Sequence, residues 1–247
     1  MTFFSSFFGK GPKKPTLAEY IARAKAGDVD AQFHLGLSYK SGERGFPRDL
    51  NEAVKWFSMA ADQGDSSSQF NLGNCYRLIG DSNQAFRNYS LAAAQAHPGS
   101  QHALGNCYAM GFGVPRDLLE SAKWFLKAAE QGAPDSQFNI ATCYRLGEGV
   151  PQNDVEAARW YKESAIKGDL RSQHWLALSY SFGKGLEKNL ILACAWMIVA
   201  AESGSTESTP WAKKLMGGMC REDKTKVNAL VKNLLAKVAE HKTNLPV

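Results

Sequence analysis

Residues 104–132 read LGNCYAMGFGVPRDLLESAKWFLKAAEQG, and residues 140–168 read IATCYRLGEGVPQNDVEAARWYKESAIKG, the same pattern 36 residues later. Two further series keep this step, namely Trp124, Trp160, Trp196 and Gly132, Gly168, Gly204. A recurring period of roughly 20–50 residues is typical of proteins built from stacked repeats. We therefore predict a repeat architecture with units of about 36 residues.

Each unit is predicted to form two helices. The first helix opens on a small residue and Gln, and its apolar and aromatic positions lie four apart, as in Leu104 and Tyr108. The second opens on a capping signal, such as Asp117 three residues before Glu120, in which the first side chain caps a free N–H and the second reaches back. Five such units begin near Asp30, Ser67, Gly99, Asp135 and Arg171.

The loop between the two helices carries Gly-x-Gly, at Gly147 and Gly149 in the fourth unit. A phosphate-binding loop normally occurs once, after a strand, with Lys-Ser/Thr behind it. This loop recurs between two helices and lacks that signature, so we interpret it as a turn.

Both quoted stretches resemble the Sel-one-like repeat family, which is related to the tetratricopeptide repeats. The resemblance covers roughly residues 17–204, with a departure in the second unit, where Asn88 takes the Trp position and the loop is four residues shorter. It implies an all-α, right-handed α-solenoid of antiparallel helix pairs. The expected order is a flexible Phe/Lys-rich tail (1–15), an N-terminal capping helix (16–28), five repeats (29–204) and C-terminal capping helices (205–247).

Charge is placed unevenly along the 247 residues. The net charge is +3 over residues 1–15 and +5 over residues 211–247, which leaves −3 for the middle. Nucleic-acid binders usually concentrate positive charge on one face, so a nucleic-acid partner is not expected. No apolar run is long enough to span a membrane, and the N-terminus does not read as a secretory signal, so a cytoplasmic protein is expected.

The N-terminal stretch FFSSFF spaces its phenylalanines four apart, with lysines behind. It could form a short helix that docks on a membrane surface or a partner, or it could be a disordered end.

Cys75, Cys107 and Cys143 share one position of the repeat, which predicts small buried thiols rather than disulfides or metal ligands. His102 and His174 take a position held elsewhere by Phe and lie two repeats apart, too far to share a metal. We expect no cofactor, no metal and no catalytic residues, because every candidate group already has a place in the repeat pattern.

Three positions of the first helices vary from unit to unit while their neighbours stay the same. In the resembled family the first helices line the concave face, where Asn could bind a peptide backbone and Arg a carboxylate. The alternative is a helix face that is merely solvated. The predicted binding residues are His34, Asn71, Asn74, Arg77, Asn106, Asn139, Thr142, Arg145 and Trp175.

The resemblance implies a non-catalytic scaffold or adaptor, often bacterial, that binds a peptide or protein segment in its concave groove. A protein of the cell envelope that binds or hydrolyses its ligand is one alternative. A structural unit that associates with itself through the C-terminal helices is another, although a monomer is expected.

Overall fold

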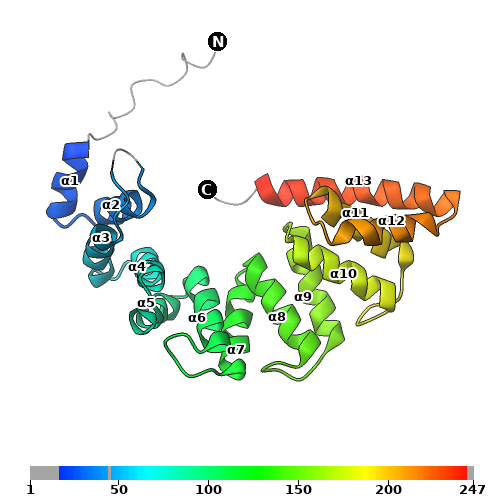
Figure 1. Ribbon diagram of the computed structural model, residues 1–247, viewed down its shortest axis with the longest axis horizontal. Coiled ribbons are helices and arrows are strands. Elements are labelled where there is room, and N and C mark those ends of the chain that lie inside the picture. The colour runs from blue at the N-terminus through cyan, green and yellow to red at the C-terminus, as the bar shows by residue number, and fades with distance from the viewer. Residues whose placement is uncertain (1–16, 44–45, 244–247) are drawn as a thin grey trace, which may run out of the picture. The chain divides into compact units, whose positions relative to one another are not determined.

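The computed structural model describes residues 17–43 and 46–243, and this part of the chain contains thirteen helices and no strand (Figure 1). It divides into two compact units, with the boundary between His97 and Pro98. The Phe/Lys-rich tail of residues 1–15 lies outside the described residues.

The first unit is a stack of helix pairs. Helices α2 and α3 form one pair and α4 and α5 the next, α3 packs on α4, and the short α1 packs on α2. The bounds are α1 Leu17–Lys25, α2 Val29–Ser41, α3 Leu50–Asp62, α4 Ser66–Ile79 and α5 Ser82–Ala94.

The second unit continues the same order from α6 to α11, each helix packing on the next. Helices α12 and α13 then pack on α11, and α13 also reaches α9. The bounds are α6 Pro98–Met110, α7 Leu118–Glu130, α8 Pro134–Leu146, α9 Asp154–Ile166, α10 Leu170–Phe182, α11 Leu190–Glu202, α12 Ser208–Gly217 and α13 Arg221–Thr243. The predicted all-helical fold of paired helices is confirmed. Within the described ranges, none of the helices has the length and apolarity that crossing a membrane requires.

At the start of the second helices, only one of the two hydrogen bonds of the predicted capping box forms. The side chains of Asp81, Asp117 and Asn153 accept hydrogen bonds from the backbone N–H three residues on, as the pattern indicates. The reciprocal bond is absent where the acid was expected to reach back: Glu120 instead pairs with Lys123 at 2.6 Å, and Glu156 with Arg159.

The reason for this difference lies in the preceding helix. The N–H of Asp117 donates to the carbonyl of Tyr108 at 2.9 Å, and the N–H of Asn153 to that of Tyr144 at 2.8 Å. Because the backbone donor is already satisfied, the glutamate is available to a neighbouring lysine or arginine. The tyrosine that recurs in these repeats therefore fixes the point at which the loop ends and the second helix begins. It does so through its backbone carbonyl, and its ring takes no part in this bond.

The second glycine of the Gly-x-Gly loop sets the distance between repeats. Gly147 and Gly149 both have φ of +73°, as a turn requires. A Cβ at Gly149 would lie 1.9 Å from the carbonyl oxygen of Leu118, at the start of α7 in the preceding repeat, and one at Gly185 would lie 1.9 Å from that of Asp154. The loop is thus a turn that is also an inter-repeat contact.

Replacing Gly149 by Ala should destabilise the protein far more than replacing Gly147. Both variants force a side chain into left-handed backbone, at a cost of about 1–2 kcal/mol. Only Gly149→Ala also forces a clash with backbone, which adds roughly 1–3 kcal/mol. Urea unfolding of the two variants measures the difference, and equal losses of unfolding free energy would contradict the inter-repeat contact.

A buried glutamine ties four of the first helices, α2, α4, α8 and α10, to the helix that precedes each of them. The Nε2 atoms of Gln32, Gln69, Gln137 and Gln173 donate to the carbonyls of Ala24, Ala61, Ala129 and Ala165, at 2.9–3.3 Å. Each of these carbonyls also accepts from the backbone N–H of the glycine three residues on, at 2.9–3.1 Å. The amide is therefore a second donor to the same oxygen, and its bond joins the two helices.

A second glutamine, just after the second helix, completes this contact in the first three repeats. Gln63 donates to Oε1 of Gln32 at 2.9 Å, and Gln131 to Oε1 of Gln101 at 2.7 Å. In the fourth repeat Lys167 stands at this position and donates to the carbonyl of Gly132 instead. Oε1 of Gln137 is then buried with no hydrogen-bond partner among the described residues.

Restoring glutamine at position 167 should stabilise the fourth repeat. Lys167→Gln offers a donor to the unpaired Oε1 of Gln137, and satisfying such a group contributes about 1–3 kcal/mol. Lys167→Met, which offers no donor, is the matched control and should destabilise. Thermal and urea unfolding report both changes, and a Gln variant no more stable than the Met variant would refute the reasoning.

Candidate interaction surface

All nine predicted binding residues lie on first helices, within one unit or the other. Arg77 is exposed and the other eight are partly buried. The first unit holds His34 on α2 and Asn71, Asn74 and Arg77 on α4; the second holds Asn106 on α6, Asn139, Thr142 and Arg145 on α8, and Trp175 on α10.

The variable positions are connected from one repeat to the next. In the first unit, Nζ of Lys40 at the end of α2 donates to Oδ1 of Asn71 on α4 at 2.8 Å. In the second, the guanidinium of Arg145 on α8 lies 4.0 Å from the ring centroid of Trp175 on α10. Lys40 and Arg145 take the third of the three variable positions, and Asn71 and Trp175 take the first. The third variable position of one repeat thus contacts the first of the next, a contact between repeats that the sequence did not predict.

The middle variable position bonds within its own repeat. Oδ1 of Asn74 accepts from the hydroxyl of Tyr89 at 2.9 Å, and Oγ1 of Thr142 lies 3.2 Å from the hydroxyl of Tyr161. In the third repeat this ring is Phe125, which has no hydroxyl to offer Asn106. The recurrence of polar residues here therefore has an internal cause, and ligand binding by Asn74 and Thr142 stays a prediction.

The two aromatic members of the set have different surroundings. His34 meets Tyr20 of α1 edge-on, with ring centroids 6.1 Å apart, and also packs against Phe33. Trp175 instead lines a hollow between the fourth and fifth repeats.

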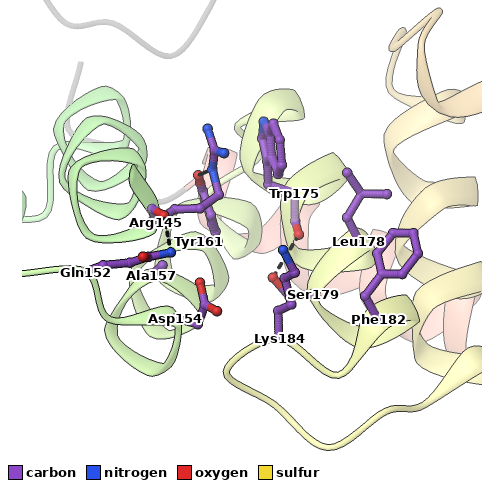
Figure 2. A pocket seen from close by; sticks show the side chains of 10 residues that line it. All are labelled: Arg145, Gln152, Asp154, Ala157, Tyr161, Trp175, Leu178, Ser179, Phe182 and Lys184. Atoms are coloured by element: carbon purple, nitrogen blue, oxygen red, sulfur yellow. Dashed lines mark hydrogen bonds between the residues drawn. The ribbon is translucent and has the colours of Figure 1, made fainter. Parts of the chain in front are cut away.

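This hollow, which we call the Arg145 pocket, has a volume of about 210 Å³. Figure 2 shows Gln152 and Asp154 on the α9 side facing Leu178, Ser179 and Phe182 on α10. Its full lining is Arg145, Gln152, Asp154, Ala157, Tyr161, Trp175, Leu178, Ser179, Phe182 and Lys184.

Arg145 is held in place by two rings. Its Nε donates to the hydroxyl of Tyr161 at 3.2 Å, and its guanidinium lies over Trp175. The rings of Tyr161 and Trp175 are stacked, 6.2 Å apart at 14°. Burial raises the pKa of Tyr161, so the hydroxyl stays protonated. Among the described residues no carboxylate lies within 4.0 Å of Arg145, and its two terminal nitrogens make no hydrogen bond.

A second hollow that is also lined by Trp175 differs from the Arg145 pocket, because its arginine is already paired with carboxylates. It measures about 270 Å³ and contains Arg171 and His174. Arg171 already pairs with Asp135 at 2.5 Å and Asp169 at 2.7 Å and lies over Phe138. Its charge is therefore satisfied within the protein, which distinguishes it from Arg145.

The sequence analysis missed part of the Arg145 pocket. Tyr161, Phe182 and Lys184 line the pocket but were not among the predicted binding residues. Phe182 is the last residue of α10, a position that Met110 and Leu146 fill in earlier repeats, and all three are exposed apolar side chains. That periodic exposure was the available signal.

His102, His174 and four of the five cysteines have packing roles. Nδ1 of His102 on α6 lies 2.8 Å from Oγ of Ser136 on α8. Nδ1 of His174 on α10 lies 2.9 Å from Oγ of Ser208 on α12. Burial lowers the pKa of both rings. Over the described ranges no three His, Cys, Asp or Glu residues are grouped to hold a metal. Cys75, Cys107, Cys143 and Cys194 are buried free thiols, and Cys220 is exposed.

Thiol labelling should distinguish Cys220 from the other four cysteines. Burial raises the pKa of Cys143 to about 11 and also raises those of Cys75 and Cys194, so little reactive thiolate forms at neutral pH. A chromogenic disulfide reagent should therefore titrate one of the five thiols in the folded protein and all five in denaturant. Cys220→Ser should remove the native reaction; rapid labelling of a second thiol would contradict the burial.

Comparison with known proteins identifies the class. The Sel1 repeat model matches residues 29–65, 66–97, 98–132, 134–169 and 170–205, so the chain belongs to the Sel1 repeat family.

Two solved structures are similar over most of the chain. One is a protective antigen of uropathogenic Escherichia coli strains with an SLR fold, at 31% identity and a TM-score of 0.80 over 91% of this chain. The other is a Sel1 repeat protein from Oxalobacter formigenes, at 33% identity and a TM-score of 0.74 over 81% of this chain. This chain covers 48% and 59% of those two chains.

A curated relative matches only locally. It is the ERAD-associated E3 ubiquitin-protein ligase component HRD3A of Arabidopsis thaliana, 39% identical over 54 residues, which are 22% of this chain and 8% of the relative.

Proposed function

We propose that this Sel1 repeat protein is a non-catalytic scaffold that binds a peptide or protein segment through its first helices, which are α2 and α4 in the first unit and α6, α8 and α10 in the second. The proposal includes a cytoplasmic location, which is supported by four buried thiols, one in each of the second to fifth repeats, that are not paired in disulfides.

The observation that carries the proposal is the contrast between fixed and variable positions. The buried glutamines and the loop glycines recur because each bonds or packs against the neighbouring repeat. The variable first-helix positions take no part in these glutamine and glycine contacts and remain partly accessible, and several of them line the Arg145 pocket. A surface that can change without loss of the fold is suited to recognising a partner.

The family and the plant relative support a scaffold role, and they do not indicate which surface binds. Sel1 repeats serve as protein-interaction scaffolds, and the plant relative is named as a component of an E3 ubiquitin-protein ligase. Because this chain spans about half of the solved relatives, their whole activities are not carried over.

Site-specific photo-crosslinking in the source cell tests the proposal. A photoreactive phenylalanine at Arg77 or Phe182, both exposed on first helices, should capture a partner protein. The same residue at Arg87 or Lys162, exposed on second helices, is the matched control and should capture none. Capture only from the second helices would refute the assignment of the face, and adducts containing only this chain would favour the self-association alternative.

A further inference from the structure

We propose that the Arg145 pocket recognises a peptide by one carboxylate side chain together with one large apolar side chain two residues away from it. This inference rests on the proposed scaffold function and names the chemistry of the partner at one site.

The charge of the pocket favours a single carboxylate. Arg145 and Lys184 contribute two positive charges to the lining, and Asp154 contributes the one negative charge. The terminal nitrogens of Arg145 can donate two parallel hydrogen bonds, which is the geometry that a carboxylate accepts best. Asp154 would repel a second carboxylate, so a run of acidic residues is not the preferred partner.

The guanidinium is already ordered before any ligand arrives. Tyr161 holds Nε, and Trp175 covers one face of the group. A donor that is fixed in advance loses little side-chain entropy when it binds, so a larger part of each hydrogen bond contributes to affinity. Arg171, the other arginine beside Trp175, does not offer this because two carboxylates already occupy it.

The apolar part of the site lies along one face of α10. Trp175, Leu178 and Phe182 follow each other at helical spacing, and all three line the pocket. Phe182 is 61% exposed and meets Trp211 of α12 edge-on at 6.4 Å between ring centroids. The Phe182 ring is therefore held by Trp211, while its exposed part can contact an apolar side chain of a ligand.

Size and spacing restrict the occupant to a short piece of chain. The pocket volume of about 210 Å³ is below the usual range for sites that hold drug-sized ligands. Trp175 and Phe182 are seven residues apart on a helix, which is roughly 10 Å along its axis. Side chains two apart on an extended peptide point the same way and are separated by about 7 Å, so one can reach Arg145 while the other meets Leu178 and Phe182.

The test uses the full chain and three capped peptides in calorimetric titrations. The peptides are Gly-Gly-Glu-Gly-Phe-Gly-Gly, acetylated and amidated, and the versions with Gln or Lys in place of Glu. We expect the Glu peptide to bind with a dissociation constant at or below about 1 mM. The Gln peptide should bind about tenfold more weakly, since a charge-assisted bond becomes a neutral one, and the Lys peptide more weakly still.

Three protein variants, each checked for an unchanged melting profile, locate the effect. Arg145→Gln should remove the preference for Glu over Gln. Phe182→Ala should weaken the Glu and Gln peptides by the same factor. Arg77→Gln, the same change at the equivalent position of the second repeat, should alter neither and is the matched control.

The outcomes separate this proposal from the scaffold function. Equal binding of the three peptides, no binding at all, or a Glu preference that survives Arg145→Gln would overturn the pocket chemistry. Crosslinking of a partner to first helices would then leave the scaffold function standing. Peptide discrimination that depends on Arg145, without any crosslinked partner, would support the pocket and count against the scaffold.

Discussion

The buried glutamine near the start of α2, α4, α8 and α10, bonded to the end of the helix before it, is the contact on which the stacking depends. A carbonyl oxygen near the end of a helix can accept two hydrogen bonds. In the second repeat, the carbonyl of Ala61 accepts one from the N–H of Gly64 and one from Nε2 of Gln69 in the next helix. At these four junctions the glutamine therefore links the end of one helix to the beginning of the next.

The loops impose a second constraint of the same kind. Gly149 and Gly185 lie so close to backbone of the preceding repeat that no side chain fits. These contacts are made with backbone atoms, so they do not depend on the side chains of the rest of the surface. This is why the first-helix positions can differ between repeats while the helix pairs stay alike.

The variable positions acquire chemistry through their neighbours. The same relation between adjacent repeats gives a hydrogen bond where Lys40 meets Asn71 and a cation–π contact where Arg145 meets Trp175. Nζ of Lys40 is bonded to an amide oxygen, whereas the terminal nitrogens of Arg145 make no hydrogen bond among the described residues and lie next to apolar side chains. The Arg145 pocket thus arises from a pair of residues in two repeats, and neither repeat contains it alone.

The sequence by itself determined the helical repeat and much of its local detail. Periodicity reported the helix pairs, and short-range rules placed the caps at Asp117 and Asn153 and the left-handed turn at Gly147, because all of these depend on residues within a few positions. The carbonyl of Tyr108 that displaced the expected capping box belongs to the preceding helix. Arg145 is likewise brought to Tyr161 and Trp175 across two helix junctions. The rotation of one helix against the next decides such contacts, and only the tertiary structure defines that rotation.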